Sequence, residues 1–233
     1  MTAKKLIIFD VDGTLLDSNK EGSQCFGQAF QDTFGQPIPT MDWSQYPSVS
    51  DTIIFEAAYE TTFGQKPTKE QTTQFEDNYN ELLRIKLATY PERFKPVKGS
   101  KALTDYLLVH PDYVVGIATG GWKGSAVQKL EHIGIQYDKM FDAYADGHWE
   151  RKNIVLESIE KATAIHEQFE KIVYVGDAKW DVITIRNLSL PLIGIRIKGD
   201  VDFLKKLGTQ DVIMDYLDIE EFLDLVDKAV VPL

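Results

Sequence analysis

The sequence predicts an α/β fold in which a doubly wound parallel sheet carries an inserted all-helical domain. Three features indicate this: short apolar runs, amphipathic stretches between the later runs, and one long segment that lacks such runs. Short apolar runs bounded by Gly and Asp are typical of parallel strands that are covered on both faces. The expected strands are residues 6–9, 113–118, 172–175, 192–195 and 212–214.

Helices are expected between the later strands. In residues 125–133, Val127, Leu130 and Ile133 share one helical face, and residues 153–169 show the same spacing of apolar positions. Strands that alternate with amphipathic helices favour a doubly wound, Rossmann-like sheet.

The segment from residue 18 to residue 93 has a different pattern. It lacks buried-strand runs, carries aromatic and apolar residues at helical spacing, and contains breaks at Gly35 and Gly64. We therefore expect an insert of about four helices over residues 18–93. Residues 1–17 and 94–233 then form the α/β core, and residues 90–96 form the returning hinge.

Composition excludes several classes of function. The chain has 233 residues and a net charge of −11, so a nucleic acid backbone would be repelled over most of the surface. A single cysteine, Cys25, excludes an intramolecular disulfide and fits a reducing compartment. The start of the chain lacks the apolar core of a signal peptide, and no apolar run is long enough for a membrane span. We expect a cytoplasmic protein that binds neither nucleic acid nor membrane, and the sequence favours no particular oligomeric state.

Polar residues follow three of the expected strands. Asp10 ends the first strand, Thr119 and Gly120 follow the second, and Asp177 follows a later one. Ligands bind beyond the carboxyl ends of the strands in open parallel sheets. Asp12 lies two residues after Asp10, so both carboxylates point the same way in an extended segment, which is costly without a cation or a shared proton. Carboxylate oxygens, water and a substrate phosphate suit Mg²⁺, the cofactor that we expect here.

Residues 7–18, Ile-Ile-Phe-Asp-Val-Asp-Gly-Thr-Leu-Leu-Asp-Ser, match the first motif of the haloacid dehalogenase superfamily over its whole length. The chain resembles the branch of phosphoglycolate phosphatase and β-phosphoglucomutase, whose helical cap lies where the insert is expected. The resemblance implies that Asp10 attacks phosphorus and forms an aspartyl-phosphate. Asp12 would protonate the leaving alcohol and later deprotonate water. Dehalogenases of the family lack an aspartate at that second position, so Asp12 favours phosphoryl transfer.

The second and third motifs would bind the phosphoryl group. Thr119 matches the hydroxyl residue of the second motif, and Gly120 stands where the family often has Asn. The substitution removes a possible side-chain contact and keeps the backbone donor. The third motif is a basic residue, usually Lys, near the start of a helix. Here Arg151 and Lys152 are both candidates, and Lys152 is preferred because it lies where the helix is expected to start.

The fourth motif, residues 173–182, would complete a metal site with Asp10. The resemblance implies that Asp177 binds Mg²⁺ directly, and that Asp181 supports the metal through water or orients Lys152. The main-chain carbonyl of Asp12 is a usual further ligand in the family. In the cap, residues 46–52 are the most plausible specificity loop. For Asp51, a helix N-cap is preferred to a functional role.

Together these features predict a Mg²⁺-dependent phosphomonoesterase that acts on a small phosphorylated metabolite. A phosphotransferase of the β-phosphoglucomutase type is the nearest alternative, because an aspartyl-phosphate can return its phosphoryl group to a sugar. A catalytically idle binding or regulatory protein is the alternative from another class. Retention of Asp10, Asp12, Lys152 and Asp177 argues against it.

Overall fold

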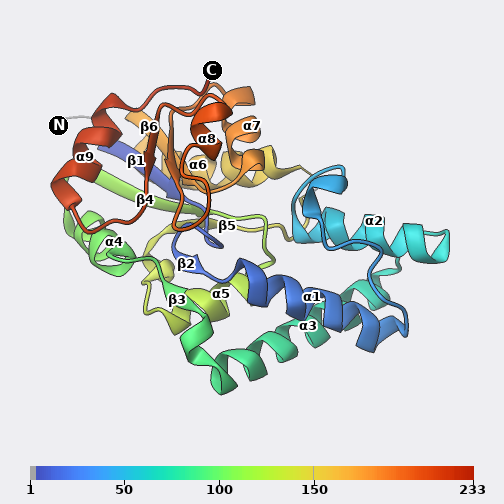
Figure 1. The fold of residues 1–233 in the computed structure, drawn as a ribbon. Helices are drawn as coiled ribbons and strands as arrows, with labels where there is room; N and C mark the ends of the chain where they lie inside the picture. The colour runs from blue at the N-terminus through green and yellow to red at the C-terminus, as the bar shows by residue number, and fades with distance from the viewer. Residues whose placement is uncertain (1–3, 149) are drawn as a thin grey trace.

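The computed structural model describes residues 4–148 and 150–233 and shows a parallel sheet with helices on both faces (Figure 1). The sheet order is β5-β4-β1-β6-β7-β8, and every neighbouring pair is parallel. The strands are β1 (Lys4–Phe9), β4 (Tyr113–Ala118), β5 (Phe141–Ala143), β6 (Phe169–Gly176), β7 (Leu192–Ile195) and β8 (Asp211–Ile213). A separate antiparallel pair joins β2 (Leu16–Asp17) to β3 (Lys95–Pro96). The predicted doubly wound sheet is therefore confirmed.

Most helices pack against this sheet, while α1, α2 and α3 lie to one side of it (Figure 1). The helices are α1 (Asn19–Phe34), α2 (Asp51–Phe63), α3 (Lys69–Thr89), α4 (Ser100–Val109), α5 (Lys123–His132), α6 (Arg151–His166), α7 (Lys179–Asn187), α8 (Phe203–Lys206) and α9 (Ile219–Lys228). Short 3₁₀ turns occur at Trp43–Gln45, Pro91–Arg93 and Tyr137–Lys139. The helical insert thus consists of three α-helices and two 3₁₀ turns, whereas about four helices were expected. The proposed boundaries at residues 17/18 and 93/94 stay a prediction.

Strand β1 lies in the middle of the sheet. Ile7 is paired with Val115 of β4 on one side and with Val173 of β6 on the other. Residues 6–9 are fully buried, which explains why this strand is apolar at every position. The chain passes outward from β1 to β4 and β5 and then returns to β6, so the direction of winding changes beside β1. Ligands bind at such a switch point in doubly wound sheets.

Strand β5 was not expected from the sequence. It has three residues, and a polar residue, Asp142, lies between Phe141 and Ala143. A run this short carries no usable alternation of apolar residues.

In the described ranges, no helix combines the length and apolarity that crossing a bilayer requires.

An aromatic cluster connects the insert to the loop after β4. The ring of Phe55 from α2 stacks on Phe75 from α3, with centroids 4.4 Å apart and 9° between the planes. Trp122, which precedes α5, packs edge-on to Phe75 and stacks on Phe26 of α1. Each such ring pair contributes about 0.5–1.5 kcal/mol beyond its buried area. The insert therefore packs on the segment that follows Ala118, next to the carboxyl edge of the sheet.

Candidate active site

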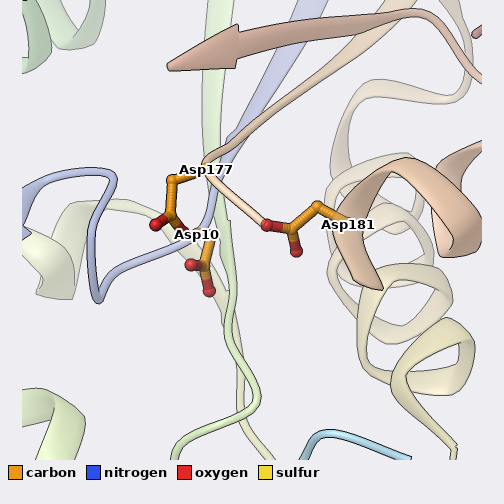
Figure 2. A group of neighbouring side chains, drawn as sticks. All are labelled: Asp10, Asp177 and Asp181. Carbon is orange, nitrogen blue, oxygen red and sulfur yellow. The ribbon is translucent and has the colours of Figure 1, made fainter. Parts of the chain in front are cut away.

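Three carboxylates meet at the carboxyl edge of the sheet (Figure 2). Asp10 directly follows β1, is 3% exposed, and donates its backbone N–H to the carbonyl of Val175 in the neighbouring strand. Asp177 follows β6, and Asp181 lies in the first turn of α7. One carboxylate oxygen from each residue lies within 4.8 Å of the others.

The turn after β1 brings the backbone close to Asp177. Gly13 has φ of +85°, and a Cβ atom at this position would lie 2.2 Å from Asp177 Oδ2. Glycine is therefore required both by the backbone conformation and by the space that it leaves beside the carboxylate. The main chain at Gly13 therefore lies next to the carboxylate of Asp177.

Burial makes the charge of these carboxylates costly. It raises the pKa of Asp10 to about 7, although the neighbouring guanidinium of Arg151 opposes the shift. Burial and the charges of Asp181 and Asp10 likewise raise the pKa of Asp177 well above its ordinary value. A divalent cation would offset this cost, and a set of oxygen donors suits Mg²⁺. The residues therefore fit the expected metal.

The basic residue beside Asp10 is Arg151, and not Lys152, which the sequence interpretation preferred for this position. Arg151 is 6% exposed, and its Nη2 donates to Asp10 Oδ1 at 2.9 Å and to Asp181 Oδ1 at 2.7 Å. Lys152 pairs with Glu150 at 2.6 Å, and half of its side chain is exposed. Helix α6 begins at Arg151, before residues 152 and 153, where its start was expected. Successive residues are rotated by about 100°, so Arg151 faces the sheet edge and Lys152 faces solvent.

Asp181 orients Arg151. Its Oδ1 accepts from Nη2 and also from Nε of Arg151, the latter at 3.1 Å, while its Oδ2 accepts from the backbone N–H of Ala178 at 3.0 Å. The side chain is fully buried. Asp181 thus contacts the basic residue, which is Arg151 rather than the expected Lys152. Asp181 also belongs to the group of carboxylates that can hold a metal.

Thr119 and Gly120 lie at the end of β4, beside Arg151. Thr119 is 2% exposed and lines the same cavity as Asp10. A Cβ atom at Gly120 would lie 2.3 Å from Arg151 Nη1 and 2.7 Å from the carbonyl oxygen of Val49. Nη1 donates to that carbonyl at 3.1 Å. The guanidinium therefore occupies the space that a side chain at position 120 would need.

Asp12 makes an ion pair that the sequence interpretation missed. The ammonium group of Lys129 lies 2.8 Å from Asp12 Oδ1 and 2.7 Å from Oδ2, and the hydroxyl of Ser18 donates to Oδ1. Burial alone lowers the pKa of Lys129, but Asp12, Tyr79 and Asp51 outweigh it and raise the pKa above its ordinary value. Lys129 therefore stays charged.

A signal for Lys129 was present in the sequence. It shares the buried face of α5 with Ala126 and Leu130, and it is 2% exposed. A lysine in an apolar stripe at helical spacing is rarely buried without a partner, and this one pairs with an acidic residue of the first motif.

The loop before α2 contributes to the cavity from the insert. Helix α2 begins at Asp51, whose Oδ2 accepts from the backbone N–H of Trp122 at 3.0 Å, while its own N–H donates to the carbonyl of Gly120. Burial raises the pKa of Asp51 to about 7, opposed by Lys129 and by the Trp122 N–H. The expectation that Asp51 is the N-cap is wrong: Ser50 occupies the N-cap position, makes no side-chain cap bond, and has no hydroxyl partner among the described residues. Asp51 connects the insert to the loop after β4.

Comparison with known proteins agrees with this geometry. The family described as "Haloacid dehalogenase-like hydrolase" matches residues 7–195, which is most of the chain. The chain belongs to the haloacid dehalogenase-like hydrolase family. A curated relative, glycerol-1-phosphate phosphohydrolase 2 of Saccharomyces cerevisiae, is 26% identical over 218 residues, covering 90% of this chain and 81% of the relative.

Solved structures with the same fold include a hydrolase from Pseudomonas syringae, which has a TM-score of 0.72 at 21% identity and covers 97% of this chain and 99% of its own. A putative β-phosphoglucomutase from Bacteroides vulgatus has a TM-score of 0.68 at 14% identity, over 98% of this chain and 90% of its own. A predicted phosphoglycolate phosphatase from Haemophilus somnus has a TM-score of 0.64 at 16% identity, over 96% of this chain and 99% of its own. The expected family is thus confirmed, and with it a hydrolase whose relatives include proteins named as phosphatases.

Proposed function

We propose that this haloacid dehalogenase-like hydrolase is a Mg²⁺-dependent phosphomonoesterase that acts through an aspartyl-phosphate on Asp10. The observation that supports this best is the position of Asp10 at the centre of the carboxyl edge. Arg151 Nη2 lies 2.9 Å from its carboxylate, and a carboxylate oxygen of Asp177 lies within 4.8 Å of it. A buried nucleophile beside a fixed cation and a group of carboxylates that can hold a metal suits attack on a phosphoryl group.

The proposed reaction divides into two displacements at phosphorus. The carboxylate of Asp10 attacks phosphorus and the ester bond to the alcohol breaks, while Asp12, in its protonated form, transfers its proton to the departing oxygen and becomes a carboxylate. Asp12 then accepts a proton from a water molecule that attacks the aspartyl-phosphate, which regenerates Asp10 and releases phosphate. Arg151 and the amides near Thr119 would bind the phosphoryl oxygens.

The metal would be held by carboxylate oxygens of Asp10 and Asp177 and by the carbonyl of Asp12, with Asp181 supporting the group. When bound, Mg²⁺ neutralises negative charge on the phosphoryl group and fixes its orientation. Arg151 provides a second, permanent positive charge beside Asp10. Two sources of positive charge match the dianion of a phosphate monoester.

We favour hydrolysis over phosphoryl transfer between sugar positions. The curated relative is named a phosphohydrolase, whereas the putative β-phosphoglucomutase is similar in fold at 14% identity. Turnover of a hexose 1-phosphate, with and without its bisphosphate, separates the two activities. Isomerisation that outruns phosphate release would favour the mutase.

Hydrolysis of p-nitrophenyl phosphate tests the proposal directly. We expect release of phosphate that requires Mg²⁺ and falls by several orders of magnitude in Asp10→Asn, because an amide cannot act as the ionised nucleophile. Asp112→Asn is the matched control, since Asp112 is exposed and precedes β4 at the opposite edge of the sheet. Activity that persists in Asp10→Asn, or that needs no divalent ion, contradicts the mechanism. A protein that is inactive on every phosphomonoester would favour the binding or regulatory alternative.

A further inference from the structure

We propose that Lys129, Asp51 and Ser50 form a subsite for the leaving group, and that it selects small, uncharged alcohols that carry hydroxyl groups. This inference rests on the proposed phosphomonoesterase function, since it identifies the alcohol half of the substrate. The three residues line the cavity that also contains Asp10 and Asp12. They come from both sides of it, Lys129 from α5 of the core and the other two from the start of α2.

Lys129 offers a hydrogen-bond donor at the cavity. Its ammonium group contacts both oxygens of Asp12, and two N–H groups suffice for these contacts. A lysine ammonium has three donors, so one is left for a ligand. Lys129, Gly22 and Tyr79 all line the cavity, and a Cβ atom built on Gly22 would lie 3.5 Å from Nζ and 3.8 Å from the hydroxyl oxygen of Tyr79. Gly22 belongs to α1, and because it has no side chain, space remains there beside the Lys129 ammonium and the Tyr79 hydroxyl.

Ser50 and Asp51 offer complementary groups. Ser50 is 1% exposed and lines the cavity, yet its hydroxyl has no hydrogen-bond partner within residues 4–148 and 150–233. An unsatisfied buried hydroxyl is costly, so a partner supplied by a ligand is favoured. Asp51 Oδ2 is engaged by the N–H of Trp122, which leaves Oδ1 as an acceptor. The subsite thus contains a cationic donor, an acceptor and a hydroxyl, and alcohol hydroxyls can satisfy all three.

The charges around the cavity argue against an anionic or a cationic leaving group. Among the described residues that line it, the two cations are already paired, Arg151 with Asp10 and Asp181, and Lys129 with Asp12. A leaving group with a carboxylate or a second phosphate would meet Asp51 without an uncommitted positive charge. An ammonium group would meet Lys129. A neutral hydroxylated group avoids both repulsions.

The apolar lining favours a short chain. Phe26, Trp43 and Ile54 contribute aromatic and aliphatic surface to the same cavity. These side chains would offer apolar surface to the carbon skeleton of a short alcohol. We therefore expect a leaving group of a few carbons.

A panel of small monophosphates tests the proposed selectivity. Glycerol 1-phosphate and n-propyl phosphate share the ester and the three-carbon chain, and differ in two hydroxyls. We expect kcat/KM for glycerol 1-phosphate to exceed that for n-propyl phosphate at least about tenfold, because the propyl ester leaves the polar groups unpaired. Phosphoglycolate and phosphoethanolamine, with an anionic and a cationic leaving group, should both fall below glycerol 1-phosphate.

Variants assign the selectivity to the subsite. The ratio of glycerol 1-phosphate to n-propyl phosphate hydrolysis is measured within each variant, so a decrease common to both esters cancels. Lys129→Met and Ser50→Ala should each lower this ratio at least about threefold. Lys123→Met, at an exposed position in the first turn of the same helix, should keep the wild-type ratio. Should Lys129→Met fail to fold, Ser50→Ala decides.

The outcomes separate this inference from the proposed function. If p-nitrophenyl phosphate is hydrolysed but the wild-type ratio is near one, the subsite is wrong and the phosphatase remains. Preference for phosphoglycolate or phosphoethanolamine, or an unchanged ratio in both variants, also overturns the subsite. If no phosphomonoester is hydrolysed, the proposed function fails, and the subsite fails with it.

Discussion

Replacing Gly120 with alanine is predicted to displace Arg151 from Asp10. The new methyl group would lie 2.3 Å from Arg151 Nη1 and 2.7 Å from the carbonyl oxygen of Val49, both well inside contact distance. The carbonyl belongs to the backbone, so the guanidinium is the group that must move. Its shift would break the hydrogen bond of 2.9 Å to Asp10 that holds the proposed nucleophile.

The expected magnitudes follow from this geometry. Overpacking of this kind costs about 1–3 kcal/mol of folding free energy. A hydrogen bond to a charged group contributes about 1.5–3 kcal/mol. If the transition state loses that much stabilisation, kcat falls by about tenfold to about a hundredfold. Gly120→Ala should therefore remain folded and be much less active.

Turnover of p-nitrophenyl phosphate and urea denaturation measure the two effects. Gly121→Ala is the matched control, since its new methyl group would come no closer than 3.6 Å to another heavy atom. It should lose less stability and less activity. The double variant Gly120→Ala/Arg151→Lys should recover part of the activity, because lysine lacks the Nη1 atom that clashes. Wild-type kcat in Gly120→Ala, or a further decrease in the double variant, would refute the reasoning.

Three further predictions concern neighbouring residues. Arg151→Ala should lower kcat by at least about a hundredfold, whereas Lys152→Ala should change it by less than about twofold, because Lys152 pairs with Glu150 at the surface. Gly13→Ala should raise the Mg²⁺ concentration needed for half-maximal activity, since its methyl group would lie 2.2 Å from Asp177 Oδ2. Burial raises the pKa of Asp51 to about 7, so ionising it costs the folded state stability as pH rises from about 4 to about 8. Asp51→Asn should therefore gain stability relative to wild type over that range, as measured by urea denaturation at each pH; a constant difference would contradict this assignment.

Much of the fold was predictable because buried parallel strands leave a direct pattern in the sequence. The run at residues 6–9 is apolar at every position because β1 is covered on both faces and flanked by two strands. The order of the strands did not follow from that pattern. Nor did β5, whose three residues include Asp142, because its position depends on pairing with β4 rather than on its own composition.

The site was predictable where residue type alone determines the chemistry. Asp10 and Asp177 follow neighbouring strands, so the sheet brings them together whatever surrounds them. The choice between Arg151 and Lys152 depended on a single residue at the start of α6, because one position turns a side chain from the sheet edge to solvent. Helix boundaries are in general defined only to within about one or two residues. Lys129 was missed because its partner Asp12 is distant in sequence, and only tertiary structure brings the two together.

The two departures from the family pattern are connected in space. Arg151 stands where the family usually has Lys, and Gly120 stands where it often has Asn. The guanidinium extends past Asp10 and donates to Val49, so it fills the volume beside residue 120. A larger basic residue is thus accommodated by a smaller neighbour. Because Val49 precedes Ser50, the same guanidinium also fixes the loop that carries the proposed leaving-group subsite. The basic residue that holds the nucleophile thus links phosphoryl binding to the part of the insert that would select the alcohol.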